Sequence, residues 1–518
     1  MTAAPTAAAL PPFRPLADLL REHAAARPDH PALVQGGERL SWAQLDVLMD
    51  RIAAALQRDG LVPGDTVVLA GATSAMLAAL FLGALRAGVV VAPLATSVTP
   101  ATFAAMCRNA APRRLFVDAQ ATPLLAAGEA ADCVALEPGA PGQPMADWLA
   151  PEGSRPQPVA IGPESPFNII YSSGTTGEPK GIVQPHGMRW QHIHRGARYG
   201  YGPQTVTLLS TPLYSNTTLV VFFPTLGFGG TVHLMPRFDA GAWLALAEAE
   251  RVTHTMLVPV QYRRLLAHPD FDRRELGAFV AKFCTSAPFD AALKAEALRR
   301  WPGGLIEFYG LTEGGGTCIL EAHAHPDKLH TVGRPAEGHD IRLIDEAGFE
   351  VATGAAGEVV GRSAAMMSGY HGRPALSCEA EWFAPDGLRF IRSGDVGRFD
   401  ADGFLVLVDR RKDMIISGGF NLYPSDLEAE LRRHPAVHDV AVVGVPSVEW
   451  GETPVAFVER RAGDATEAET LRQWLNARVG KTQRLHALRF IGELPRSAIG
   501  KVLKRALRAA WVDQPPAS

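Results

Sequence analysis

Apolar stretches of strand length alternate with helical stretches through most of the first 400 residues. The segment 65–70 (DTVVLA) precedes the helical pattern of 74–88, and a second apolar strand follows at 89–94. The same order recurs where 253–259 and 278–284 lead into helical stretches. Continuous apolar strands between helices are typical of parallel sheets that are covered on both faces. The pattern therefore predicts an α/β fold for this part of the chain.

Segments rich in glycine and hydroxyl residues follow three of the predicted strands. They occupy 172–177, 285–288 and 310–316. In doubly wound parallel sheets, ligands bind beyond the carboxyl ends of the strands. We therefore expect these three segments to converge on one binding site.

The pattern changes after about residue 340, where short strands are joined by Asp-Gly or Glu-Ala-Gly turns, as in hairpins. A helix and then a strand follow within 426–445. The charged run DRRKD at 409–413 is the predicted boundary between a large domain, 1–408, and a small domain, 409–518. The predicted fold class is α/β: a large N-terminal domain of parallel α/β sheets with a small β-barrel-like subdomain, and a small, mobile α+β C-terminal domain.

Composition and charge narrow the class of protein. With 47% hydrophobic and 20% charged residues among 518, the chain has the composition of a globular protein with a sizeable core. Its formal net charge of −4 argues against a nucleic-acid or anionic-membrane partner. The most apolar stretch, 76–95, is interrupted by Arg86, Gly88 and Pro93, so it predicts a buried helix and strand and no membrane span.

Two further features bear on the compartment. The five scattered cysteines form no C-x-x-C pair, which favours unpaired thiols in a reducing environment. The first 15 residues lack the basic and apolar segments of a signal peptide. We therefore expect a cytoplasmic protein.

The loop YSSGTTGEPKG at 171–181 concentrates backbone donors of the kind that hold anions. It does not fit the P-loop spacing G-x-x-x-x-G-K-[ST], because Gly174 and Gly177 are three apart and Gly181 follows Lys180. On these residues alone, a flexible surface loop is an equally good interpretation.

This loop resembles the phosphate-loop signature of the adenylate-forming superfamily, which includes acyl-CoA synthetases, adenylation domains and luciferases. Four further motifs resemble those of that family, in the family's order. They are YGLTEGG (309–315), SGDVGRFDADGF (393–404), DRRKDMIISGGFNLYPSDLE (409–428) and PRSAIGKVLKRALR (495–508). The resemblance implies an enzyme that joins a carboxylic acid to ATP, releases pyrophosphate, and passes the acyl group from AMP to a thiol.

The resemblance also assigns roles to individual residues. Glu313 would bind Mg²⁺, although by itself it also fits a carboxylate at a helix start. Thr312 would donate to the α-phosphate, and Lys501 would bridge the acid's carboxylate and that phosphate. Asp395 would accept from the ribose hydroxyls, and its alternative is a turn residue beside Gly397. The implied ATP- and AMP-binding residues are Ser172, Ser173, Gly174, Thr175, Thr176, Gly177, Lys180, Ser286, Ala287, Pro288, Tyr309, Gly310, Asp395 and Arg410.

Thiol transfer needs a different surface at the same site. The resemblance implies that the C-terminal domain swivels about Lys412 to present it. The face then presented would carry Gly418 and Gly419, whose lack of side chains leaves room for a pantetheine arm. Trp450 matches a tryptophan that stacks on the CoA adenine in halobenzoate-CoA ligases. The implied cofactors are ATP, Mg²⁺ and coenzyme A.

The acid pocket is the part that the sequence specifies least. Ser215, in the segment PLYSNTT, stands where many acyl- and aryl-CoA ligases have a histidine. Tyr214 and Asn216 are candidate lining residues beside it, and Gly314 and Gly315 would remove side chains from the opposite wall. We expect a roomy pocket for a medium-to-bulky fatty or aryl acid, and we disfavour acetate and amino acids.

Three alternatives stay open. They are a stand-alone acyl-AMP ligase that loads a carrier protein in trans, a luciferase-like oxygenase, and a non-catalytic nucleotide-binding relative. Trp450 favours CoA, and the filled motif positions Glu313, Asp395 and Lys501 favour an enzyme. The expected partners are a small-molecule carboxylic acid and CoA, with no nucleic acid and no membrane span. The sequence leaves a homodimer open.

Overall fold

The protein divides into two compact units. The computed structural model describes residues 11–125, 133–172, 179–410, 413–417, 420–447, 451–480, 483–497 and 500–513. The first unit contains the chain up to Ile341 together with Gly361–Ile391. The second contains Arg342–Val360 together with the chain from Arg392 onward. The division therefore runs through the hairpin region, and the predicted boundary near 409 stays a prediction.

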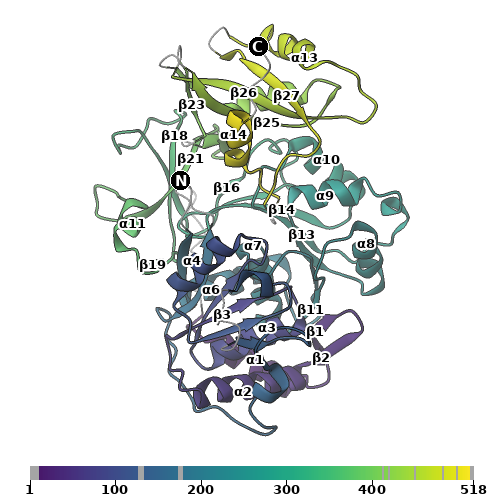
Figure 1. The fold of residues 1–518 in the computed structure, drawn as a ribbon, viewed down its shortest axis with the longest axis vertical. Helices are drawn as coiled ribbons and strands as arrows, with labels where there is room; N and C mark the ends of the chain where they lie inside the picture. Colours follow the sequence, from purple (N-terminus) through teal and green to yellow (C-terminus); the bar gives the residue numbers. More distant parts are fainter. Residues whose placement is uncertain are drawn as a thin grey trace, which may run out of the picture. The chain divides into compact units, whose positions relative to one another are not determined.

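Two large sheets form the first unit (Figure 1). One sheet has nine strands, in the order β16 (Arg334–Pro335), β15 (Cys318–Glu321), β14 (Gly304–Tyr309), β13 (Ala281–Cys284), β12 (His254–Leu257), β10 (Val206–Leu209), β11 (Thr231–Leu234), β1 (Pro31–Gln35) and β2 (Glu38–Ser41). The other has eight strands, in the order β19 (Gly369–Tyr370), β9 (Lys180–Pro185), β8 (Pro166–Ser172), β4 (Val90–Leu94), β3 (Thr66–Ala70), β5 (Arg114–Val117), β6 (Cys133–Ala135) and β7 (Gln143–Pro144).

Parallel pairing dominates both sheets. In the first, β10, β12, β13 and β14 pair in parallel, and antiparallel β15 follows at the side of β14. In the second, β8 and β9 form an antiparallel hairpin beside the parallel strands β4, β3 and β5. The helices of this unit are α1 (Leu16–Ala26), α2 (Trp42–Arg58), α3 (Ala75–Arg86), α4 (Pro100–Ala110), α5 (Met145–Trp148), α6 (His186–Arg195), α7 (Asn216–Gly227), α8 (Ala240–Ala249), α9 (Pro259–Leu266), α10 (Ala291–Arg300) and α11 (Pro374–Glu379).

One apolar core joins the two large sheets. Phe81 on α3 contacts Phe167 on β8 and Phe223 on α7, with ring centroids 6.1 and 5.5 Å away. Helix α3 is apolar on all sides, and nearly all of its residues are buried. A helix of that kind belongs inside a large core. The prediction of a buried helix and strand for 76–95 is therefore confirmed.

Short strands and a smaller α/β assembly make up the rest of the described chain. The first group is β17 (Asp340–Ile344), β18 (Gly357–Arg362), β20 (Glu381–Phe383), β21 (Arg389–Phe399) and β22 (Leu405–Arg410). The second is β23 (Ile415–Ser417), β24 (Phe420–Leu422), β25 (Val437–Ser447), β26 (Gly451–Arg460) and β27 (Ala487–Ile491), with α12 (Pro424–Arg432), α13 (Ala468–Asn476) and α14 (Lys504–Asp513). The predicted hairpins after residue 340 and the C-terminal α+β fold are confirmed.

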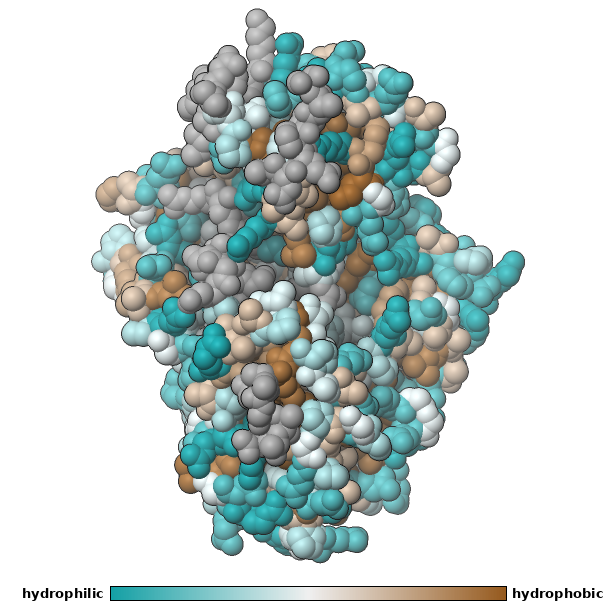
Figure 2. Space-filling model, in the orientation of Figure 1, coloured by the Kyte–Doolittle hydropathy of each residue, from teal (hydrophilic) through white to brown (hydrophobic). Residues whose placement is uncertain are grey.

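The surface and the cysteines agree with the composition. Figure 2 shows one face of the molecule, on which hydrophilic residues are widespread and apolar residues form small separate groups. None of the helices in the described ranges combines the length and apolar character that crossing a membrane requires. In the described part of the chain, none of the five cysteines forms a disulfide, and Cys133, Cys284 and Cys318 are buried.

Candidate active site

The segments that follow the parallel strands meet at one edge of the nine-stranded sheet. Because β13 and β14 run in parallel, Ser286, just beyond β13, and Tyr309, the last residue of β14, lie at the same edge of the sheet. The Thr285 hydroxyl donates to the carbonyl of Phe308 over 2.7 Å. The Ser286 hydroxyl is hydrogen bonded to that of Thr217, at the start of α7. The structure thus brings together the predicted segments 285–288 and 309–316 and the start of α7.

Glu313 is held in place by a tyrosine that the sequence did not single out. The Tyr370 hydroxyl donates to Glu313 Oε1 over 2.8 Å, and Met367 N donates to the Glu313 carbonyl over 2.8 Å. Lys180 Nζ lies 5.2 Å from the centroid of the Tyr370 ring. Burial and the nearby Glu313 raise the pKa of Tyr370, so its hydroxyl remains a donor. The Lys180 end of the phosphate-loop motif and Glu313 therefore lie on either side of one tyrosine.

The helix-start alternative for Glu313 is wrong. Residues 311–314 form a turn, in which Gly314 N donates to the Leu311 carbonyl over 3.0 Å, and Gly314 then bridges to Met366. Gly314 and Gly315 have φ values of +75° and +85°. A Cβ on Gly314 would meet the Ala365 carbonyl oxygen at 2.1 Å, and one on Gly315 would meet the Gly361 oxygen at 2.7 Å. Close backbone approach is therefore sufficient reason for both glycines, and their place in an acid-pocket wall stays a prediction.

A buried polar network fixes the backbone just before Glu313. Gln184 Nε2 donates to the Thr312 carbonyl over 2.7 Å, and the Gln184 side chain is in turn bound by Arg189. Arg189 also donates to Asn168 Oδ1 over 3.0 Å and to Asn216 Oδ1 over 2.9 Å. Burial lowers the pKa of Arg189 to about 9, so it stays cationic at neutral pH. The network connects β8, β9 and the start of α7 to the Thr312–Glu313 turn.

The predicted acid-pocket residues lie at the start of α7. Ser215 is buried and caps this helix, since its Oγ accepts from Thr217 N over 3.3 Å. Asn216 is the helix residue that accepts from Arg189. Burial raises the pKa of Tyr214. Ser215 is therefore the residue that begins this helix, and its role toward the acid stays a prediction.

Asp395 lies in the second unit and is buried in a strand. It sits within β21, opposite Arg410 of β22, next to an irregularity in the pairing at Val396 and Gly397. Its backbone N donates to Ser393 Oγ over 3.0 Å. The turn-residue alternative is therefore wrong, since Asp395 is part of a ladder.

Lys501 is carried by a tight turn in the second unit. Ser497 N donates to the Lys501 carbonyl, Gly500 N donates to the Ser497 carbonyl, and both distances are 2.8 Å. Gly500 has φ +76°, a conformation that costs glycine little. The nearby Lys504, at the start of α14, pairs with Glu428 at 2.9 Å.

Several predicted residues lie outside the described part of the chain. They are Ser173, Gly174, Thr175, Thr176, Gly177, Lys412, Gly418, Gly419 and Trp450, and only the backbone is described for Ser172 and Arg410. Within the described ranges, no three His, Cys, Asp or Glu residues gather as a metal site. A single carboxylate beside a phosphate site still fits Mg²⁺, which takes only one or two protein carboxylates.

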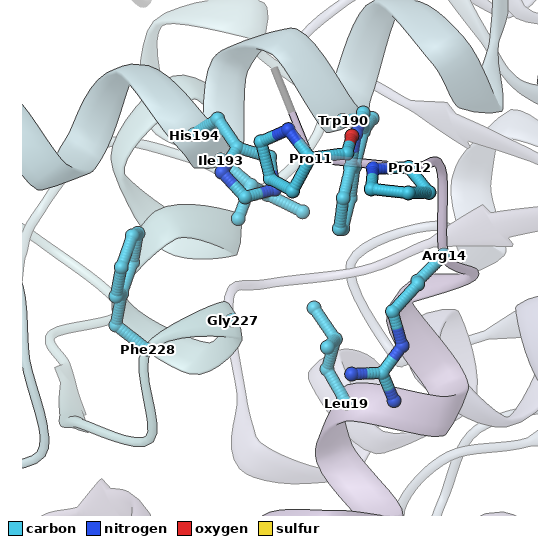
Figure 3. Close-up of a pocket in the computed structure, with 9 residues that line it drawn as sticks. All are labelled: Pro11, Pro12, Arg14, Leu19, Trp190, Ile193, His194, Gly227 and Phe228. Atoms are coloured by element: carbon cyan, nitrogen blue, oxygen red, sulfur yellow. The ribbon is translucent and has the colours of Figure 1, made fainter. Parts of the chain in front are cut away.

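A separate hollow lies beside α6, on the face that carries Trp190, Ile193 and His194 (Figure 3). Its volume is about 280 Å³. It is lined by Pro11, Pro12, Arg14, Leu19, Trp190, Ile193, His194, Gly227 and Phe228. Nearly all of these side chains are apolar, and none of them belongs to the predicted motifs.

Comparison with known proteins agrees with the motifs. Residues 20–371 match the model of the AMP-binding enzymes, and residues 426–501 match that of the AMP-binding enzyme C-terminal domain. A feruloyl-CoA synthase from Amycolatopsis is 33% identical, over 93% of this chain and 96% of its own. A fatty acid–acyl-carrier-protein ligase from Streptomyces coeruleorubidus is 30% identical, over 97% and 98%. The crystal structure of ATP-bound MatB from Rhodopseudomonas palustris superposes with a TM-score of 0.86 at 29% identity, over 96% of this chain and 99% of that one.

These matches extend over almost the whole chain and include both units. The predicted fold class, with large parallel sheets and a C-terminal α+β domain, is confirmed. The predicted enzyme class, an AMP-forming acid–thiol ligase, is confirmed as well. The chain therefore belongs to the AMP-binding enzymes, the adenylate-forming superfamily that its motifs indicate.

Proposed function

We propose that this enzyme activates a medium-to-bulky carboxylic acid, fatty or aryl, to an acyl-adenylate and then transfers the acyl group to CoA. The observation that carries the proposal is the convergence of Lys180, Tyr370 and Glu313 beside the strand ends that bear Ser286 and Tyr309. A cation, a carboxylate and a buried donor at one sheet edge suit the joining of two anions. Those reactants need positive charge and fixed donors between them.

Each residue has a role that its surroundings support. Tyr309 and the segment 286–288 hold adenine, and Lys180 holds the β- and γ-phosphates. Thr312 donates to the α-phosphate, and its backbone position is fixed by Gln184. Glu313 would hold Mg²⁺, which when bound neutralises phosphate charge.

The second unit supplies the remaining groups. Asp395 accepts from the ribose hydroxyls. Lys501, at the tip of its turn, neutralises charge that develops between the acid and the α-phosphate. Lys412 acts as the hinge between the two half-reactions.

Two thiol acceptors are candidates for the acyl group, CoA and a carrier protein. Trp450 and the pair Gly418 and Gly419 support CoA, as does the likeness to a feruloyl-CoA synthase. The likeness to a carrier-protein ligase keeps loading of a carrier protein in trans as the second candidate. Cysteines that form no disulfide within the described residues support a cytoplasmic location.

Acid-dependent exchange of pyrophosphate into ATP tests the first half-reaction. A panel of fatty, aryl and alicyclic acids should contain members that support exchange, and none should do so in a Glu313→Gln variant. Release of AMP should then rise on adding CoA and stay unchanged on adding a phosphopantetheinyl carrier protein. ATP binding without exchange for any acid would favour a non-catalytic nucleotide-binding protein.

A further inference from the structure

Helix α6 presents two different faces. Trp190, Ile193 and His194 face the apolar hollow of Figure 3. Arg189 and His192 lie at the spacing of one helical turn on another face, which the buried polar network covers. The latter face continues to Arg195, the last residue of the helix, and it carries hydrogen-bond donors that the proposed adenylation roles do not use.

Among the residues that the structure describes, none accepts from one ring N–H of His192. Its Nδ1 lies 3.4 Å from Arg189 NH1 and can only accept there. Burial and the charges of Arg195 and Arg189 lower the pKa of His192 well below its usual value, so the ring is neutral. A neutral ring that accepts at Nδ1 carries its proton on Nε2. That Nε2–H has no hydrogen-bond partner in the part of the chain that the structure describes.

His339 likewise has a ring N–H for which the described residues supply no acceptor. Its Nδ1 accepts from Thr317 N over 3.0 Å. Burial, with a smaller contribution from Arg195, lowers the pKa of His339 to about 4, so this ring is neutral too. Its proton therefore lies on Nε2, for which the described residues offer no acceptor. Both Arg195 and His339 lower the pKa of His192, and Arg195 lowers that of His339, so the three side chains lie near one another.

Arg195 is a half-buried cation for which the described ranges supply no anion. Its guanidinium lies 4.7 Å from the centroid of the Phe308 ring. No carboxylate and no hydrogen-bond acceptor reaches it from the described ranges, whereas the nearby Arg198 pairs with Glu321 at 2.9 Å. The hydroxyl of Tyr199, which lies near enough to Arg195 for that cation to act on its pKa, is buried and lacks a hydrogen-bond partner among the described residues. Buried donors are rarely left unpaired without a reason.

The three donors lie at the strand ends that form the candidate active site. Phe308, beneath Arg195, immediately precedes Tyr309 in β14. Thr317, which binds His339, immediately precedes Cys318, the partner of Tyr309 across the sheet. Hydrogen bonds lead from His192 through Arg189 to Asn216 at the start of α7. The donor cluster is therefore next to both predicted walls of the acid pocket.

We propose that His192, Arg195 and His339 bind an oxyanion at the far end of the acid, so that the preferred substrate is an acid with a second carboxylate or similar anionic group. This inference rests on the proposed function and names the substrate class of the same site. A neutral oxygen would satisfy the two imidazole donors. Only an anion also compensates the Arg195 guanidinium, which retains its charge and has its five N–H groups available.

Matched acids test the proposal on the full-length protein. Pyrophosphate exchange is measured with suberate, its half-amide and octanoate, and with 4-carboxycinnamate and 4-methylcinnamate. We expect kcat/KM for each dicarboxylate to exceed that of its uncharged counterpart by about 10- to 100-fold, the range for hydrogen bonds to charged groups. The half-amide should fall between the two. Wild-type enzyme that prefers the uncharged acids would overturn the proposal without any variant.

Variants test which residues cause the preference for dicarboxylates. Arg195→Met should reduce the ratio of dicarboxylate to uncharged acid by about 10-fold or more, and His192→Phe and His339→Phe should reduce it by less. Arg198→Met removes a neighbouring surface cation and should leave the ratio unchanged. An Arg195→Met variant that lowers kcat/KM equally for both acids would contradict the proposal, because that is the result of a purely structural role. Exchange with uncharged acids alone would refute this inference and leave the proposed function intact, whereas exchange with no acid at all would refute both.

Discussion

The turn that carries Glu313 and the turn that carries Lys501 are held by different means. The first is anchored by side chains from distant parts of the chain, with Gln184 bound to Thr312 and Tyr370 bound to Glu313. The second is held mostly by hydrogen bonds within 496–501, among the backbones of Ser497, Gly500 and Lys501 and from the Arg496 guanidinium to the Gly500 carbonyl over 3.0 Å. The difference indicates that side chains from distant parts of the chain preorganise the Glu313 turn, whereas mostly local hydrogen bonds hold the turn that presents Lys501.

Lys501→Ala should produce the largest effect. Loss of a preorganised cation costs about 10²–10³ in rate, so adenylation should fall by that factor. Transfer of the acyl group from a preformed acyl-adenylate to CoA should be nearly unaffected. The two half-reactions are measured separately, by pyrophosphate exchange and by acyl-CoA formation.

Lys504→Ala is the matched control for that experiment. It removes a lysine that lies three residues after Lys501 and pairs with Glu428. Adenylation should stay close to wild type, since the pair serves the fold of the second unit. Equal loss of both half-reactions in Lys501→Ala would show that the lysine supports folding and would contradict its assigned role.

Arg189→Met should cost stability in the first unit. The change removes the donor to Asn168 Oδ1 and the closer of two donors to Asn216 Oδ1, the other being Gln184 Nε2 at 3.4 Å, and a buried group left unpaired costs about 1–3 kcal/mol. We expect the free energy of unfolding to fall by about 2–4 kcal/mol. Chemical denaturation measures it, with Arg198→Met, an exposed arginine, as the control that changes it by less than about 1 kcal/mol. A variant as stable as wild type would mean that the network does not anchor the Thr312 turn.

Tyr370→Phe should give a smaller effect on catalysis. It removes the hydrogen bond to Glu313 and keeps the ring beside Lys180. One lost hydrogen bond of about 1 kcal/mol corresponds to a roughly fivefold lower adenylation rate. If Glu313 holds Mg²⁺, the Mg²⁺ concentration needed for half-maximal exchange should rise as well. An unchanged Mg²⁺ requirement would place the metal on other groups.

The features that could be predicted from the sequence are those set by local hydrophobic pattern and by the order of the motifs. Apolar strands, the fully buried helix α3 and the segments after β13 and β14 appear where the periodicity and the motifs placed them. Residues that reach the site from far along the chain were missed. Tyr370 binds Glu313 across 57 positions, and Gln184 binds Thr312 across 128. Such contacts depend on how β9 and β19 pair, which no local pattern of polar residues determines.

Local conformation explains the two incorrect alternatives. Glu313 does not begin a helix because Gly314 and Gly315 take positive φ and lead the chain against the backbone of 361–365. Asp395 is not a turn residue because β21 continues through it and pairs with β22. In both places, a single residue type had suggested a local role that the strand pairing overrides.

A crystal structure with an acyl-sulfamoyl adenosine, a stable mimic of the acyl-adenylate, tests the central claim most directly. The account predicts adenine between Tyr309 and the segment 286–288, the sulfamoyl group next to Thr312, and the acyl chain directed toward Asn216. Adenosine bound away from the ends of β13 and β14, or an acyl chain that leaves on the side opposite α7, would contradict it.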